Sequence, residues 1–212
     1  MKTKSEQLFE TFLTANNVQF EKIEEITAKG AYRPDFLVAL GNLHLVFELK
    51  ELAEGANFGI VDDPTKSYIK SHSRTVGDHV RRRIGSSKKQ IQYGANQGIP
   101  SILLIYNNLD PVFQIFGTED MDFTTAMYGE LTILLDKKTR QSSETFNGKN
   151  QSLQEGKNTS FSSVGRLCDR GGKTTVTLFE NVFSKLTVPY EQLPACFEVR
   201  RVEVSIEPLS FA

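Results

Sequence analysis

The chain has 212 residues, of which 39% are hydrophobic, so it is long enough to bury a core in one large domain or in one domain with an appendage. It contains no run of about 18 apolar residues, and its start, MKTKSEQLFE, lacks the apolar stretch of a secretory signal. We therefore expect a cytoplasmic protein that neither spans a membrane nor is exported. The only cysteines, Cys168 and Cys196, have no metal-ligand spacing and are too few for a disulfide framework, which predicts ordinary core thiols.

Charge is distributed unevenly along the chain. The formal net charge of −1 argues against a generic nucleic-acid coat protein. Between Lys66 and Lys89, however, eight lysines or arginines stand against one acid, Asp78, so this stretch carries +7 and the rest of the chain −8. Such a stretch indicates a phosphate-binding surface, because Lys and Arg that neutralise phosphates supply most non-specific nucleic-acid affinity. The alternative is a solvated helix face and loop that have no partner.

The first part of the chain is predicted to form a helix and then a strand hairpin. Apolar residues recur at helical spacing over 5–16, behind a candidate N-cap at Ser5. The period then changes to two, which predicts strands over 18–26, 33–40 and 43–50. Only Gly41 and Asn42 separate the last two strands, and glycine followed by asparagine suits the positive φ of a primed hairpin turn.

A second helix and a buried strand are expected next. The polar, turn-rich stretch from Glu51 to Gly77 predicts an irregular excursion. Behind Asp78 as a candidate N-cap, an apolar stripe at helical spacing predicts one continuous helix over about 79–97. The run IPSILLIY, residues 99–106, predicts a buried strand. The order is therefore α-β-β-β-α-β.

The second half of the chain is predicted to be mainly β. The segments GELTILLD, FSSVGRLC, TVTLFENV and FEVRRVEVSI resemble strands, and the polar stretch 137–160 is expected to be a long loop or hairpin tip. We therefore expect an α/β fold with a mixed sheet. Residues 1–107 are expected to form the core, with a basic insertion over 51–78, and residues 108–212 a β-rich extension packed on it.

Two acids and a lysine are predicted to meet on the hairpin. If Gly41 and Asn42 form the turn, cross-strand partners are those whose residue numbers sum to 83, so Asp35 lies opposite Glu48. Directly opposed residues share a face of the sheet with Cβ atoms roughly 4.5–5.5 Å apart, and Lys50, two residues after Glu48, points to the same face. These charges are expensive among Phe, Leu and Val side chains, which indicates a function.

A divalent metal ion explains why the two acids lie together. It would neutralise their repulsion and lower the pKa of a bound water, which then attacks a phosphodiester. Hard cations also accept backbone oxygen, so the carbonyl of Leu49 is a further candidate ligand of Mg²⁺ or Mn²⁺. Lys50 would orient the nucleophile or offset the charge that develops at phosphorus. No histidine pair has metal spacing or an obvious nucleophile beside it, so hydrolase triads are not indicated.

Pro34-Asp35, twelve intervening residues and Glu48-Leu49-Lys50 resemble the signature of the PD-(D/E)xK nuclease superfamily, which has the restriction-endonuclease-like fold. The resemblance covers residues 5–106 and includes the element order. It implies an auxiliary acid on the first helix, for which Glu10 is preferred and Glu6 competes. It also implies a Gln, Lys or Arg on the second helix, for which Gln90 is preferred over Arg83.

The resemblance implies a metal-dependent endonuclease acting on DNA, for which a homodimer would be the simplest way to cut both strands. The residues expected to bind nucleic acid are Lys66, Lys70, Arg74, Arg81, Arg82, Lys88 and Lys89. Two alternatives stay open. One is a nucleic-acid-binding or scaffolding protein that has the same fold without turnover, and the other is an RNase or an enzyme acting on small phosphate substrates.

Overall fold

The computed structural model describes residues 2–23, 32–53, 75–109 and 117–206. Its elements from the N-terminus to the middle of the chain are α1 (Lys4–Ala15), β1 (Gln19–Lys22), β2 (Phe36–Leu40), β3 (Leu43–Leu52), α2 (Asp78–Ser86), α3 (Lys88–Ala95) and β4 (Ser101–Asn107). They are followed by α4 (Asp120–Tyr128), β5 (Leu131–Thr132), β6 (Phe146–Asn147), β7 (Phe161–Arg170), β8 (Lys173–Glu180), a 3-10 turn (Tyr190–Gln192) and β9 (Phe197–Arg200).

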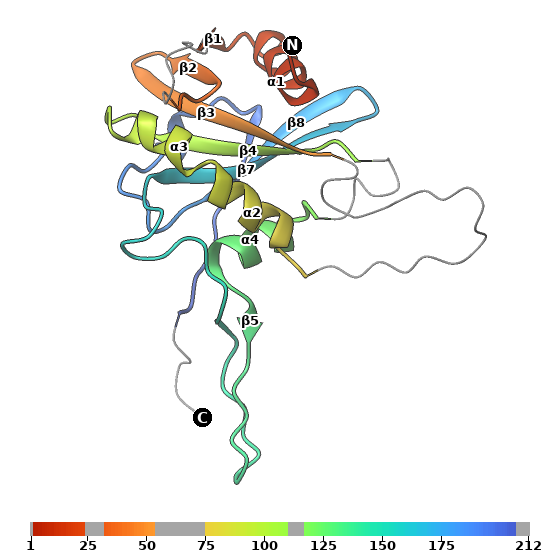
Figure 1. The fold of residues 1–212 in the computed structure, drawn as a ribbon, viewed down its shortest axis with the longest axis vertical. Coiled ribbons are helices and arrows are strands. Elements are labelled where there is room, and N and C mark those ends of the chain that lie inside the picture. Colours follow the sequence, from red (N-terminus) through yellow and green to blue (C-terminus); the bar gives the residue numbers. More distant parts are fainter. Residues whose placement is uncertain (1, 24–31, 54–74, 110–116, 207–212) are drawn as a thin grey trace, which may run out of the picture.

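A mixed, seven-stranded sheet in the order β1-β2-β3-β4-β7-β8-β9 organises the described part of the chain (Figure 1). The hairpin strands β1, β2 and β3 are antiparallel, whereas β3, β4 and β7 run parallel to one another. The expected α/β class with a mixed sheet is therefore confirmed. The strands of the second half continue the sheet of the first half, because β7 pairs directly with β4.

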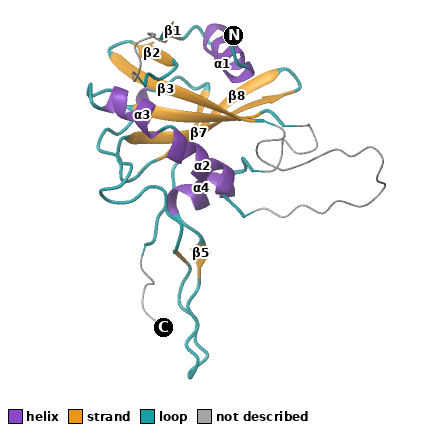
Figure 2. Cartoon of the chain, viewed as in Figure 1, coloured by secondary structure: helices purple, strands orange, loops and turns teal. Residues whose placement is uncertain are grey.

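Helices cover both faces of the sheet, as the colouring by secondary structure shows (Figure 2). On one face, Phe9 and Leu13 of α1 pack in a buried cluster with Phe36 and Phe47. On the other face, the apolar residues of α2, α3 and α4 pack in a second cluster with Leu103 and other residues of the central strands. Because successive strand residues point to opposite faces, each central strand contributes to both clusters.

The predicted hairpin register is confirmed. Phe36 pairs with Phe47 and Leu40 with Leu43, so partner numbers sum to 83 as expected. Gly41 has a φ of 61°, a positive value that glycine adopts at no steric cost. This turn fixes which side chains of β2 and β3 share a face.

Several local predictions were wrong. The continuous helix over 79–97 is two helices that break at Ser87, next to Gly85 and Ser86, which are poor residues for a helix interior. The residue preceding α2 is Gly77 in the left-handed conformation, and Asp78 is the first helical residue. Helix α1 is capped by the side chain of Thr3 rather than Ser5.

The second half contains a helix that the pattern did not predict, α4. Its buried residues do not form one stripe, so the period that reveals an amphipathic helix is absent. A capping box between Glu119 and Asp122 begins this helix. Part of the expected polar loop is a hydrogen-bonded hairpin built on β5 and β6, which projects away from the sheet (Figure 1). Leu131, Ile133 and Leu135 of this hairpin are exposed.

No helix in the described ranges is long and apolar enough to cross a membrane. Both cysteines are free and half-buried, Cys168 on β7 and Cys196 next to β9.

Candidate active site at the β2–β3 fork

Strand β3 extends past the first residue of β2 and there, among the described strands, pairs only with β4 along its other side, which opens a fork in the sheet. Asp35 lies at this fork, directly before β2. Its backbone N–H donates to the carbonyl of Phe47 at 3.0 Å, and its own carbonyl accepts from Ile23 at 2.9 Å. The main chain of Asp35 is therefore fixed between its two neighbouring strands.

The side chain of Asp35 turns toward β3. Its Oδ2 accepts a hydrogen bond of 2.7 Å from the backbone N–H of Leu49, the residue between Glu48 and Lys50. The carboxylate of Asp35 also interacts with that of Glu48, as a hydrogen bond between the two side chains contributes to the raised pKa of Glu48. The structure therefore brings Asp35 and Glu48 together.

Lys50 completes the cluster. Its Nζ lies 2.5 Å from Oε1 of Glu48. Glu48 and Lys50 pair with Leu103 and Ile105 of β4, two residues of the apolar cluster under α2, α3 and α4. Alternation along the strand places both charged residues on that face of the sheet.

Glu48 is the most deeply buried of the three, with 2% of its surface exposed. Loss of solvation, followed by the negative charge of Asp35, raises its pKa to about 8, against the opposing effect of Lys50. Burial is also the largest cause that raises the pKa of Asp35, against the stabilising N–H of Leu49. Positive charge placed between the two carboxylates would offset both effects.

The two candidate acids of α1, Glu6 and Glu10, differ in their electrostatic effect on Asp35. Glu6 contributes to the raised pKa of Asp35, whereas Glu10 is not among the causes of that shift. Glu6 forms an ion pair with Lys22, and Glu10 forms one with Lys2. Helix α1 packs on the sheet face opposite Glu48, so its acids approach the fork around Lys22. No role was predicted for Lys22 from the sequence, although the two-residue period of the strand that contains it is visible there.

Gln90 lies on α3, half-buried, and its Oε1 is buried without a hydrogen-bond partner in the described part of the chain. Arg83 lies seven residues earlier, on α2, and burial lowers the pKa of its guanidinium. Helix α3 packs against β3 and β4, on the face that carries Glu48. An unsatisfied buried acceptor costs free energy, so Gln90 is a candidate to receive a ligand or water.

The residues expected to bind nucleic acid fall into three groups. Lys66, Lys70 and Arg74 lie outside the described residues. Arg82, Lys88 and Lys89 are exposed on α2 and α3, and the Lys89 ammonium lies 4.1 Å from the ring centroid of Tyr32. Arg81 is half-buried and donates to the carbonyls of Val76 and Asn150 and to Asp78, so its guanidinium holds neighbouring segments together.

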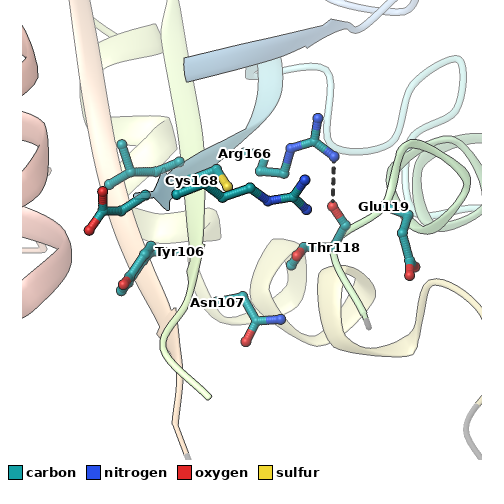
Figure 3. Close-up of a pocket in the computed structure, with 9 residues that line it drawn as sticks. Tyr106, Asn107, Thr118, Glu119, Arg166 and Cys168 are labelled. Carbon is teal, nitrogen blue, oxygen red and sulfur yellow. Dashed lines mark hydrogen bonds between the residues drawn. The ribbon is translucent and has the colours of Figure 1, made fainter. Parts of the chain in front are cut away.

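A small cleft opens at the C-terminal ends of β4 and β7 (Figure 3). Arg166 of β7 donates to the carbonyl of Thr118 at 3.0 Å and pairs with Asp120 at 3.0 Å. Through the parallel register, Lys50, Ile105 and Arg166 form one row across three strands. The row places a second cation, Arg166, on the same sheet face as Lys50. None of the predicted site residues lines the cleft itself.

In the described ranges, no group of three or more His, Cys, Asp or Glu side chains is arranged to hold a metal ion. The fork offers two carboxylates and, beside them, the Leu49 main chain. In a β-strand the N–H and C=O of one residue point the same way, so the Leu49 carbonyl lies on the side of Asp35. Comparisons of the chain with protein-family models, curated proteins and solved structures gave no match.

Proposed function

We propose that this protein is a Mg²⁺- or Mn²⁺-dependent endonuclease that hydrolyses phosphodiester bonds in DNA and has a restriction-endonuclease-like core. One observation carries the proposal. Asp35, Glu48 and Lys50 meet at the fork, with the Asp35 carboxylate bound to the N–H of Leu49 and Lys50 paired with Glu48. A buried acid and a half-buried acid beside one lysine cost stability, which is expected where a site is built for binding or catalysis.

The donor set at the fork suits a hard cation. Asp35, Glu48 and the Leu49 carbonyl supply three oxygens, and Mg²⁺ usually keeps several waters and takes substrate phosphate oxygens as further ligands. Such an ion would supply positive charge and lower the pKa of a water that attacks phosphorus. Its charge would also offset the loss of solvation and the repulsion from Asp35, which together raise the pKa of Glu48.

The other roles in the proposed reaction fall to side chains near the two acids. If Glu48 bound a cation, Lys50 would be released from its ion pair with Glu48. The Lys50 ammonium could then donate to a phosphate oxygen or orient the attacking water. Glu6, which already acts electrostatically on Asp35, is the better-placed acid of α1, and Glu10 is the second choice. The Oε1 of Gln90, which no described residue hydrogen-bonds, could accept from a water or from a nucleotide hydrogen-bond donor.

One observation favours a second candidate, a DNA-binding protein of this fold that lacks turnover. In the structure Lys50 is paired with Glu48, and the described residues contain no group of three acidic, histidine or cysteine side chains at metal-binding spacing. A protein in which the ion pair persisted in the presence of metal would bind DNA through exposed cations such as Arg82, Lys88 and Lys89 without cutting it.

Cleavage of labelled DNA separates the two candidates. Supercoiled, linear and single-stranded DNA are incubated with the full chain in Mg²⁺, Mn²⁺ or a chelator, and binding is followed in parallel. The nuclease proposal expects metal-dependent products that disappear in Asp35→Asn and in Lys50→Met, with binding retained in both. Binding without metal-dependent products on every substrate would establish the second candidate instead.

A further inference from the structure

A cleft adjoins the fork on the same face of the sheet. Residues of β1, β2, β3, α3 and their flanks line it, among them Arg33, Leu37, Val46 and Tyr93. Leu37 and Val46 are cross-strand partners and form its floor. Asp35 and Glu48 lie two residues further along the same strands, which is roughly 7 Å away. A phosphate held at the fork therefore has its neighbouring nucleotide within reach of this cleft.

The walls of the cleft offer one aromatic ring and one unsatisfied cation. Tyr93 of α3 is half-buried, and the guanidinium carbon of Arg33 lies 5.7 Å from the centroid of its ring. The Nε of Arg33 is buried and has no hydrogen-bond partner in the described part of the chain. A buried guanidinium donor without a partner is costly, so a ligand that accepts from it would be favoured.

Polar groups stand at the rim. Gln97, which follows α3, and Glu21 of β1 are exposed lining residues of the cleft. Half-buried Leu37 and Ile99 add apolar surface to it. The cleft therefore combines apolar and aromatic surfaces with a donor and acceptors at its edges. A nucleobase presents the complementary features, because its faces are apolar and polarizable and its edges carry hydrogen-bonding groups.

We infer that this cleft binds one unpaired nucleobase of the nucleic-acid strand whose phosphate lies at the β2–β3 fork. The inference rests on the proposed function and specifies its substrate. A base in a duplex has its faces covered by stacking and its edge paired, so only a single-stranded or extruded base exposes the surfaces that the cleft would contact. The protein is thereby assigned a preference for DNA with unpaired nucleotides, such as single strands, gaps or branches.

Binding of 2-aminopurine DNA in a chelator tests the cleft without any cleavage. The full chain is titrated into a short single strand that carries 2-aminopurine, into the same strand paired with its complement, and into free nucleoside monophosphate. We expect the single strand to bind at least several-fold more tightly than the duplex, with a change in 2-aminopurine emission. Equal binding of strand and duplex, or binding of the free nucleotide as tight as that of the strand, would overturn the inference.

Substitution of Tyr93 provides a second test of the cleft. Tyr93→Leu keeps apolar bulk but removes the aromatic face, and should weaken single-strand binding about tenfold, since base stacking on an aromatic ring contributes on that order. Tyr93→Phe should bind as the wild type does, and so should Gln92→Ala, an exposed neighbour on α3 outside the cleft. Unchanged binding by a folded Tyr93→Leu would contradict the inference.

The two proposals fail in different ways. Metal-dependent cleavage that depends on Asp35, together with unaltered binding by Tyr93→Leu, would reject the cleft and keep the nuclease. Weakened single-strand binding by Tyr93→Leu without cleavage of any DNA would keep the base-binding cleft and reject the nuclease.

Discussion

Oδ2 of Asp35 accepts a 2.7 Å hydrogen bond from the backbone N–H of Leu49, across the fork between β2 and β3. This contact holds the first acid against the strand segment that carries Glu48 and Lys50. The three charged side chains are therefore positioned by main-chain geometry rather than by flexible loops. Sites built on strands are held more precisely than sites built on loops, which suits a catalytic cluster.

The charge of Asp35 should be needed for catalysis and not for folding. Asp35→Asn keeps an acceptor for the N–H of Leu49 but removes the negative charge beside Glu48. We expect cleavage to fall at least a hundredfold, while the melting temperature stays the same or rises because repulsion is relieved. Rates measured with excess enzyme check this, with Glu155→Gln, an exposed acid away from the fork, as the control. Wild-type rates in Asp35→Asn would contradict the proposal.

The raised pKa of Glu48 predicts how stability depends on pH. The folded pKa, about 8, lies above the ordinary value of 4.5, so the folded state holds this proton more tightly than the unfolded state. Its stabilising contribution is complete below the unfolded pKa and is lost progressively as pH rises from about 4.5 to about 8, at up to about 1.4 kcal/mol per pH unit. Urea unfolding at several pH values should show this loss in the wild type and a flatter dependence in Glu48→Gln. If the free energy of unfolding depended on pH in the same way in both proteins, a raised pKa of Glu48 would be excluded.

Lys50 should act on the transition state more than on binding. Lys50→Met removes the ion pair with Glu48 and the cation beside the phosphate. We expect kcat to fall by about a hundredfold and KM to change little, because many exposed cations remain to bind the DNA backbone. Steady-state kinetics decide this, and a mutant that changes KM alone would make Lys50 a binding residue.

The two acids of α1 should differ in importance. Glu6 raises the pKa of Asp35 and Glu10 is not among the causes of that shift. We therefore expect Glu6→Gln to reduce cleavage at least tenfold and Glu10→Gln to reduce it less. Both substitutions remove one ion pair with a lysine, so each serves as the control for the other. A larger effect of Glu10→Gln would reverse this ranking.

Two glycine substitutions test the packing of the central sheet and the backbone of α2. A Cβ at Gly165 of β7 would lie 2.7 Å from both Leu104 Cδ2 and the carbonyl of Thr177. Gly165→Ala should therefore destabilise the protein by about 1–3 kcal/mol. Gly85→Ala on α2 meets nothing within 4 Å and should stabilise it by about 0.5–1 kcal/mol. Denaturant unfolding measures both, and a neutral Gly165→Ala would show that the sheet adjusts there.

The fork was predictable because a two-residue turn determines the register of every pair in its hairpin. Gly41 and Asn42 placed Asp35 opposite Glu48, and alternation placed Lys50 on the same face. The helix break at Ser87 was not predicted, because the apolar stripe continues across it into α3. The ranking of Glu6 and Glu10 depends on how α1 packs, which helical periodicity does not determine.

Other features depend on contacts between distant segments. The pairing of β7 with β4 joins residues about sixty positions apart, and its row of Lys50, Ile105 and Arg166 follows only from that tertiary pairing. The cleft beside the fork likewise combines β1, β2 and α3, and its unsatisfied Arg33 Nε cannot be recognised from a local pattern. Sequence spacing therefore predicted the acids and the lysine, but not their surroundings.

The most direct test of the central claim is a crystal of the full chain soaked in Mn²⁺, with anomalous scattering recorded at the fork. The proposal predicts a Mn²⁺ ion bound by the carboxylates of Asp35 and Glu48, with Lys50 displaced from Glu48. An ordered fork without Mn²⁺, in which Lys50 still pairs with Glu48 at saturating metal, would contradict it.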